Sequence, residues 1–82
     1  MISYNNNWVY RNIHGYDILV NKNDNNILSI SPILGELFFA LEKVQGGIDT
    51  YIEEWKDRNN INNDLSSTID YFLKKEVFIH EE

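Results

Sequence analysis

The chain has 82 residues, of which 43% are hydrophobic, so its length suits a single small domain with one core. Thirteen acidic and seven basic residues give a formal charge of -6 and a pI near 4.7, which argues against binding nucleic acid or anionic lipid. The absence of cysteine excludes disulfides, thiolate nucleophiles and Cys-based metal centres. No membrane span or signal peptide is visible, so we expect a cytoplasmic domain, either free-standing or excised from a longer protein.

The first third of the chain predicts three β-strands. Trp8 to Ile13 is a run of aromatic and β-branched residues that ends before His14-Gly15. From Tyr16 to Asn21, alternate residues point to opposite faces. A polar turn over residues 22–26 then leads into a third strand, Ile27 to Ile30. Short turns between the strands predict an antiparallel meander.

The same alternation predicts which residues share a face of the sheet. Leu28 and Ile30 are expected to pack under the helices. Leu19 and Ile27 are expected to share the opposite face, which three helices on one side would leave open. Two explanations for that face stay open: a contact between two copies of the chain, or cover by the aromatic side chains of the first strand, Trp8 and Tyr10.

A first helix is predicted to begin at Ser31-Pro32. Ser31 can cap the free N–H groups of the first turn, and Pro32 fits the first helical position. Apolar residues then recur at helical spacing as far as Val44. Gly46-Gly47 should end the helix.

Two more helices follow in the pattern. The second runs from about Asp49, its expected cap, through Arg58. After a loop over residues 59–63, Asp64 should cap a third helix that extends to about Glu76, and residues 77–79 form a short extended tail. The predicted fold class is therefore α+β, with a three-stranded antiparallel sheet followed by three helices.

No group of residues in the sequence predicts catalysis. The two histidines, His14 and His80, lie near opposite ends of the chain, and no pair stands four apart on a helix as in a metal site. The serines have no recognisable base partner. Glu53 and Glu54 are adjacent on a helix and point in different directions. We therefore expect a non-catalytic domain that needs neither a metal nor another cofactor.

The order and spacing of three segments resemble a known family. They are a strand pair (17–21 and 27–31), a helix with a glycine turn (35–41 to Gln45-Gly46-Gly47), and a last helix with an apolar close (69–73 and 77–79). Over about residues 16–79 the chain resembles the PqqD-like domain, the RiPP recognition element that binds precursor peptides in ribosomal peptide modification. Ser31 stands where the family commonly has Asn, and Val77 where it commonly has Gly.

The resemblance implies one winged helix-turn-helix-like domain over residues 1–82 that does not bind DNA. It also implies that the leader region of a precursor peptide adds as a strand beside the third strand, against the third helix. Such a domain is a peptide chaperone in natural-product biosynthesis. It presents the precursor to a separate enzyme: a radical-SAM protein, a lasso-type protease and cyclase, or another type. The implied peptide-binding residues are Ile27, Leu28, Ser29, Ile30 and Ser31 on the strand and Thr68, Tyr71, Phe72 and Lys75 on the helix.

The helix residues also have purely structural explanations. Phe72 fits a core position, and Tyr71 fits a surface aromatic. Lys75, beside Lys74, fits a solvated cation. Both the binding and the structural explanations stay open at this point.

Two other functions stay open for the whole chain. A winged-helix DNA-binding regulator would share the fold. However, the predicted third helix carries three acids and two lysines, with both lysines near its C-terminal end, whereas helices that contact DNA bases use their N-terminal half. A small acidic protein-interaction subunit, such as an immunity or antitoxin-like partner, fits the net charge, because negative potential steers a basic partner.

Overall fold

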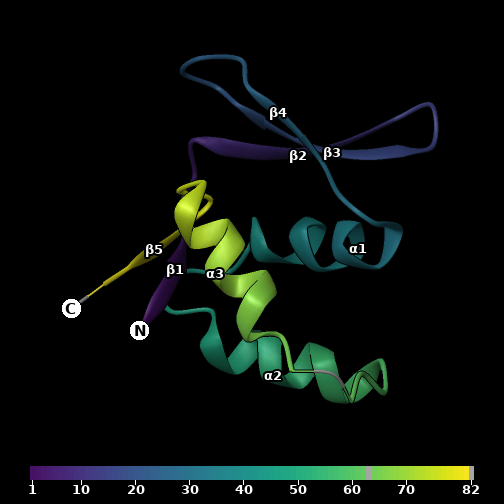
Figure 1. Ribbon diagram of the computed structural model, residues 1–82, viewed down its shortest axis with the longest axis vertical. Helices are drawn as coiled ribbons and strands as arrows, with labels where there is room; N and C mark the ends of the chain where they lie inside the picture. The colour runs from purple at the N-terminus through teal and green to yellow at the C-terminus, as the bar shows by residue number, and fades with distance from the viewer. Residues whose placement is uncertain (63, 82) are drawn as a thin grey trace. The chain divides into compact units, whose positions relative to one another are not determined.

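The computed structural model describes residues 1–62 and 64–81 (Figure 1). In chain order the elements are β1 (Ile2–Tyr4), β2 (Trp8–Ile13), β3 (Tyr16–Asn21), β4 (Ile27–Ser29), α1 (Pro32–Leu41), α2 (Asp49–Arg58), α3 (Ser66–Lys74) and β5 (Phe78–His80). Across these residues the fold is α+β, with the three-stranded antiparallel sheet and three helices that the sequence predicts. A two-stranded sheet of β1 and β5 is an addition that the sequence did not predict.

The chain divides into two compact units, which we describe one at a time. The sheet unit is Asn6–Val44, and the helical unit combines Met1–Asn5 with Gln45–Glu82. The sheet unit therefore contains β2, β3, β4 and α1. The helical unit contains β1, α2, α3 and β5.

The sheet unit is built on two tight turns. His14 and Gly15 join β2 to β3 with φ angles of 51° and 83°, as a two-residue hairpin turn requires. Between β3 and β4, Asn25 takes a φ of 62° and donates its N–H to the carbonyl of Asn21 (2.9 Å). The polar turn predicted over residues 22–26 is therefore confirmed. Asn tolerates this left-handed backbone better than most residues. The sheet order is β2-β3-β4.

The register of the sheet corrects the predicted assignment of faces. Leu19 pairs with Leu28, so these two share one face, and Leu19 is fully buried. Ile27 pairs with Val20 on the opposite face and is 60% exposed. The prediction that Leu19 and Ile27 share the open face is therefore wrong. The turn closes on Asn21 and Asn26, so odd-numbered residues of β3 lie opposite even-numbered residues of β4.

Of the remaining predictions about the two faces, one agrees with the structure and one does not. Leu28 and Ile30 lie on the Leu19 face and are half-buried, in agreement with the prediction that they pack inward. Trp8 and Tyr10 share that face as well, because Tyr10 pairs with Leu19. They therefore do not cover the open face, and that explanation is wrong.

The first helix begins where predicted and ends early. Ser31 is the N-cap and Pro32 the first helical residue, but the Ser31 side chain makes no capping hydrogen bond. α1 ends at Leu41, ahead of the predicted glycine terminator. After Leu41 the backbone turns more tightly, because the N–H groups of Lys43 and Val44 donate to carbonyls three residues back, those of Ala40 and Leu41 (both 3.1 Å). Gly47 pairs with Ser3 in the helical unit instead of ending the helix. The buried residues of α1 are Gly35, Leu37, Phe38 and Leu41.

The helical unit joins the two ends of the chain. β1 and β5 are antiparallel, with Ile2 opposite His80 and Tyr4 opposite Phe78. β5 corresponds to the predicted extended tail, whereas β1 was not predicted. A strand of three residues whose partner lies more than 70 residues away leaves no local pattern.

α2 and α3 match the predicted helices, with different caps. α2 spans the predicted residues, but Asp49 is not its cap, because its carboxylate accepts the N–H of Ile2 (2.8 Å) instead. α3 is shorter than predicted, and its N-cap is Leu65. Asp64 still accepts the N–H of Ser66 (2.9 Å) and so satisfies a donor of the first turn.

The core of the helical unit is aromatic and aliphatic. The rings of Phe72 and Phe78 lie 5.5 Å apart, which ties α3 to β5. Asn63, at the end of the predicted loop, lies outside the described residues. No helix in the described part of the chain is long and apolar enough to cross a membrane. The buried hydrophobic residues of this unit are Tyr4, Ile48, Ile52, Trp55, Phe72, Val77 and Phe78.

Candidate peptide-binding edge

The outer edge of β4 carries unpaired backbone groups. β4 bonds to β3 through the flanking pairs Asn21–Asn26 (2.9 Å) and Asp17–Ile30 (3.1 Å). Alternate residues of an antiparallel strand direct their backbone groups to opposite sides, so Ile27 and Ser29 direct theirs away from β3. Within residues 1–62 and 64–81, the N–H and C=O groups of these two residues make no hydrogen bond. They could pair with an added strand.

The opposite edge of the same sheet is partly blocked. On β2 the even-numbered residues direct their backbone N–H and C=O groups away from β3. The N–H of Tyr10, in the middle of that edge, donates to Oε1 of Glu42 (2.5 Å). Glu42 is the C-cap residue of α1, so the end of the helix holds a carboxylate against the strand. A peptide would have to displace this contact to pair along β2. β4 is therefore the more accessible edge.

A polar cluster between β2 and β3 fixes the helix on the sheet. The Tyr10 hydroxyl donates to the Asp17 carboxylate, and Asn12 donates to the same oxygen (3.1 Å). The hydrogen bond to Asp17, assisted by desolvation, raises the pKa of Tyr10. A Cβ on Gly35 would lie only 2.5 Å from the Asp17 Oδ1 atom, so glycine allows α1 to approach the strand closely. The cluster is therefore explained by its role in packing α1 against the sheet.

The five predicted strand residues do not contribute equally. Ile27 and Ser29 supply the open backbone groups, and both side chains are exposed. Leu28 and Ile30 use their backbone on β3. The carbonyl of Ser31 already accepts the N–H of Gly35 (3.0 Å) within α1. The usable edge is therefore shorter than the predicted stretch from Ile27 to Ser31.

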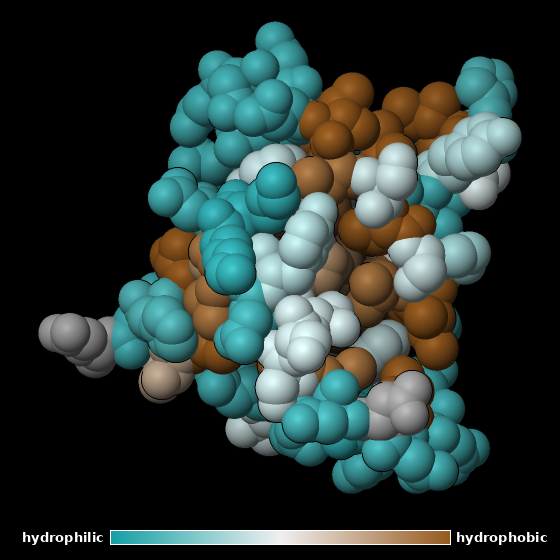
Figure 2. Space-filling model, in the orientation of Figure 1, coloured by the Kyte–Doolittle hydropathy of each residue, from teal (hydrophilic) through white to brown (hydrophobic). Residues whose placement is uncertain are grey.

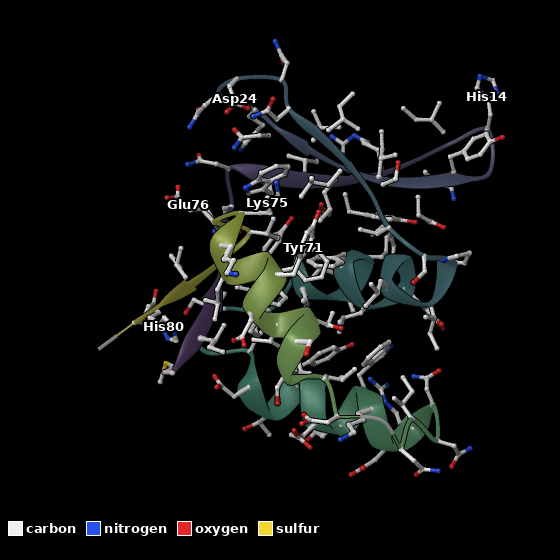
Figure 3. All side chains as sticks on the ribbon, viewed as in Figure 1. His14, Asp24, Tyr71, Lys75, Glu76 and His80 are labelled. Atoms are coloured by element: carbon white, nitrogen blue, oxygen red, sulfur yellow. The ribbon has the colours of Figure 1, made fainter. Side chains whose placement is uncertain are left out.

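The four predicted helix residues differ in exposure. Tyr71 is 47% exposed, and the Lys75 Nζ lies 5.8 Å from the centre of its ring, on the same side of α3 (Figure 3). Thr68 is half-buried one turn earlier. Phe72 is only 3% exposed and packs on Phe78, so its core explanation is the correct one. These residues belong to the helical unit and the β4 residues to the sheet unit.

The described residues contain no cluster of three or more potential metal ligands. His14 lies in the β2–β3 turn and Asp24 in the β3–β4 turn, at opposite ends of the sheet (Figure 3). His80 is exposed on β5. A cavity of about 330 Å³ in the helical unit is lined by Met1, Gly47, Asp49 and Thr50. Its one carboxylate is already bonded to the N–H of Ile2.

The N-terminus of α3 carries a stable negative charge. The hydroxyl of Ser66 donates to Asp64 Oδ1 (2.5 Å), and the Ser66 N–H donates to the same oxygen. These two bonds lower the pKa of Asp64, so this exposed carboxylate is ionised at neutral pH. A negative charge at this position opposes contact with a phosphate backbone.

The sequence analysis missed two features of this sheet. One is the block on β2, because nothing in the sequence links Glu42 to Tyr10. The other is which residues share the exposed face with Ile27, because that depends on the register of the strands.

Comparisons of the chain with protein-family models, curated proteins and solved structures find no match.

Proposed function

We propose that this protein binds the leader region of a ribosomally synthesised precursor peptide by strand addition at the outer edge of β4. The open backbone groups of Ile27 and Ser29 are the observation that carries the proposal. Each residue offers one donor and one acceptor, so an added strand can form two hydrogen-bonded pairs there. Main-chain bonds of this kind give affinity, and neighbouring side chains give selectivity.

The finer description of the fold belongs to the same proposal. The resemblance over about residues 16–79 supports a PqqD-like, winged helix-turn-helix-like domain, and the α+β composition agrees with it. The β2-β3-β4 order with a separate β1-β5 sheet is not a clear match to that fold. The resemblance also implies residues of α3; of these, Tyr71 and Lys75 are exposed and Phe72 is buried.

The proposed domain binds and presents the peptide without altering it. A separate cytoplasmic enzyme, whether a radical-SAM protein, a lasso-type protease and cyclase or another type, carries out the modification. Binding the precursor and the enzyme together raises the effective concentration of one near the other. The domain itself would use no metal and no cofactor.

The test is a titration of the full chain against fluorescein-labelled leader segments from short open reading frames beside its gene. We expect saturable binding with a micromolar or tighter Kd. Ser29→Pro removes the outward N–H, and proline is tolerated on a strand edge whose N–H faces solvent. Ser29→Ala is the matched control, because it removes the hydroxyl and keeps the N–H.

Ser29→Pro should weaken leader binding about tenfold, since it removes one ladder hydrogen bond and introduces a ring at the edge. Ser29→Ala should bind like the unmodified chain. Circular dichroism and thermal unfolding check that both variants fold. If no leader binds saturably, or if both variants bind equally, strand addition at β4 is wrong. Salt-dependent binding to duplex DNA, or capture of a toxin, would favour the corresponding alternative.

A further inference from the structure

The face of the sheet that carries Ile27 is apolar and exposed. Apolar side chains gather over the β2–β3–β4 sheet in the space-filling view (Figure 2). By register, Val9, Val20 and Ile27 form one row across the three strands, and Arg11, Ile18 and Ser29 form the next. The large hydrophobic residues most exposed on this face are Ile13 (49%), Tyr16 (74%) and Ile27 (60%).

This face differs from the usual solvent side of an antiparallel sheet. Such a side normally alternates with the core side and is polar. Contiguous exposed apolar residues instead indicate an interaction site. The apolar row that includes Val20 and Ile27 ends at the unpaired edge of β4. A strand added there would therefore extend the hydrogen-bonded ladder and the apolar face together.

The geometry of the edge determines where the side chains of an antiparallel added strand would point. Two of its residues would lie directly opposite Ile27 and Ser29 in hydrogen-bonded pairs and point onto the outer face. The residue between them would lie opposite Leu28 and point to the inner face. Leu28 is half-buried, so it keeps apolar surface for this residue to cover. Three successive positions of the peptide would thus have apolar neighbours.

The row containing Ser29 adds a preference for size. Ser29 has a short side chain, and its neighbour in the same row is the half-buried Ile18. Ile18 lies two strands from the added strand in this row, about 9.6 Å away, so a long side chain such as leucine can reach toward it over the short Ser29. A small residue there would leave the outer face uncovered.

The size of the face favours a peptide over a second copy of the chain. β2 and β3 have six residues each and β4 has three, so at roughly 3.3 Å per residue and about 4.8 Å between strands the face covers roughly 240 Å². A stable protein–protein interface buries about 800 Å² on each partner. The chain is also strongly acidic, with a formal charge of -6, which opposes self-association and favours a peptide with basic flanks.

We propose that the peptide bound at β4 carries three successive apolar residues and that its two outward residues pack beside Ile27 and extend the apolar face that Ile18, Val20 and Ile27 form. This inference rests on the proposed function and names the class of peptide that it selects. An amphipathic strand, apolar at alternate positions only, would leave one of the two faces uncovered.

The test uses three synthetic twelve-residue peptides with identical Lys- and Thr-containing flanks. Their central residues are Leu-Leu-Leu, Ser-Leu-Ser and Leu-Ser-Leu. Each lost apolar contact should weaken binding about fivefold, so Ser-Leu-Ser should bind about 25-fold and Leu-Ser-Leu about fivefold more weakly than Leu-Leu-Leu when the outer residues face Ile27 and Ser29. If Leu-Ser-Leu binds more weakly than Ser-Leu-Ser, the outer face does not select the peptide and the inference is overturned. Chemical shift changes at the amides of Ile27 and Ser29 locate the bound strand.

Two variants of the chain make the test specific. Ile27→Ser should weaken the Leu-Leu-Leu peptide about fivefold and leave the Ser-Leu-Ser peptide unchanged, because only the first has an outward leucine that contacts Ile27. Ile13→Ser is the matched control, since Ile13 is exposed on the same face but lies on β2, away from the edge. It should change neither affinity.

The outcomes separate this inference from the proposed function. If a natural leader binds and depends on the N–H of Ser29, but serine in place of the central leucines costs no affinity, the apolar preference is wrong and strand addition stands. If no peptide binds at β4, both proposals are wrong. If sedimentation shows a dimer that Ile27→Ser dissociates, the occupant of the face is a second copy, and the inference is overturned.

Discussion

Truncating Leu19 or Ile27 to alanine tests the two faces of the sheet directly. Each change removes three carbons, worth about 2.4 kcal/mol at roughly 0.8 kcal/mol per buried methylene. Leu19 is fully buried, so it should lose that full amount plus a cavity term, about 3 kcal/mol in total. Ile27 is 60% exposed, so Ile27→Ala should cost about 1 kcal/mol, which includes the lower strand propensity of alanine.

The assay is equilibrium unfolding in urea, with the midpoint and slope fitted for both variants. A chain of this length has a stability of roughly 4 to 12 kcal/mol, so losing about 3 kcal/mol in Leu19→Ala would be plainly visible. Tryptophan fluorescence provides the signal, because Trp8 and Trp55 are both buried. Since they belong to different units, the fluorescence follows both parts of the chain.

The result that would refute this reasoning is a similar loss in both variants. It would mean that Ile27 is as buried as Leu19 and that the outer face is covered. A loss below about 1 kcal/mol in Leu19→Ala would equally contradict the register, because such a small cost is typical of exposed positions. Either outcome would remove the apolar face on which the inferred peptide class depends.

Three other predictions concern the remaining residues of the site. Phe72→Ala should destabilise the chain by about 3 kcal/mol or more in urea unfolding, whereas Tyr71→Ala should cost well under half of that, because the first ring is buried and the second is about half exposed. Gly35→Ala should lower the melting temperature, since its Cβ would lie 2.5 Å from the Asp17 carboxylate, and an added Asp17→Ala should restore part of the loss. Tyr10 has a folded-state pKa above its ordinary value of 10.0, so stability is retained below pH 10 and should fall as the pH rises through the folded pKa. Tyr10→Phe should show less of this alkaline loss in unfolding experiments between pH 8 and 11, and an identical pH profile would contradict the role of the Asp17 hydrogen bond.

Local patterns predicted most elements of the fold. Alternating polarity from Tyr16 to Asn21 is confirmed as β3, and Pro32 is confirmed as the first residue of α1. His14-Gly15 marks a turn because a two-residue hairpin needs positive φ angles. In each case the determining interactions lie within a few residues of one another, so the sequence contains the necessary information.

The sequence analysis placed the third strand at a free edge of the sheet, whereas other features around the proposed site depended on distant contacts. The edge residues Ile27 and Ser29 are open, as strand addition requires. Phe72 proved to be core because it meets Phe78 from β5. Glu42 blocks the other edge through a contact with Tyr10, which lies 32 residues away. Neither contact is visible in a helical or strand pattern.

The amino-acid sequence was sufficient to predict a small acidic α+β chain, its main strands and helices, and an exposed third strand, because these follow from charge, spacing and backbone preference. The folded chain was needed to identify the buried side of that strand and the occupied edge of its sheet. The length of the β3–β4 turn places Leu19 inside and Ile27 outside, and the carboxylate of Glu42, at the C-cap of α1, partly blocks the edge of β2. Register and long-range packing depend on contacts between residues far apart in the chain, and those contacts leave β4 open.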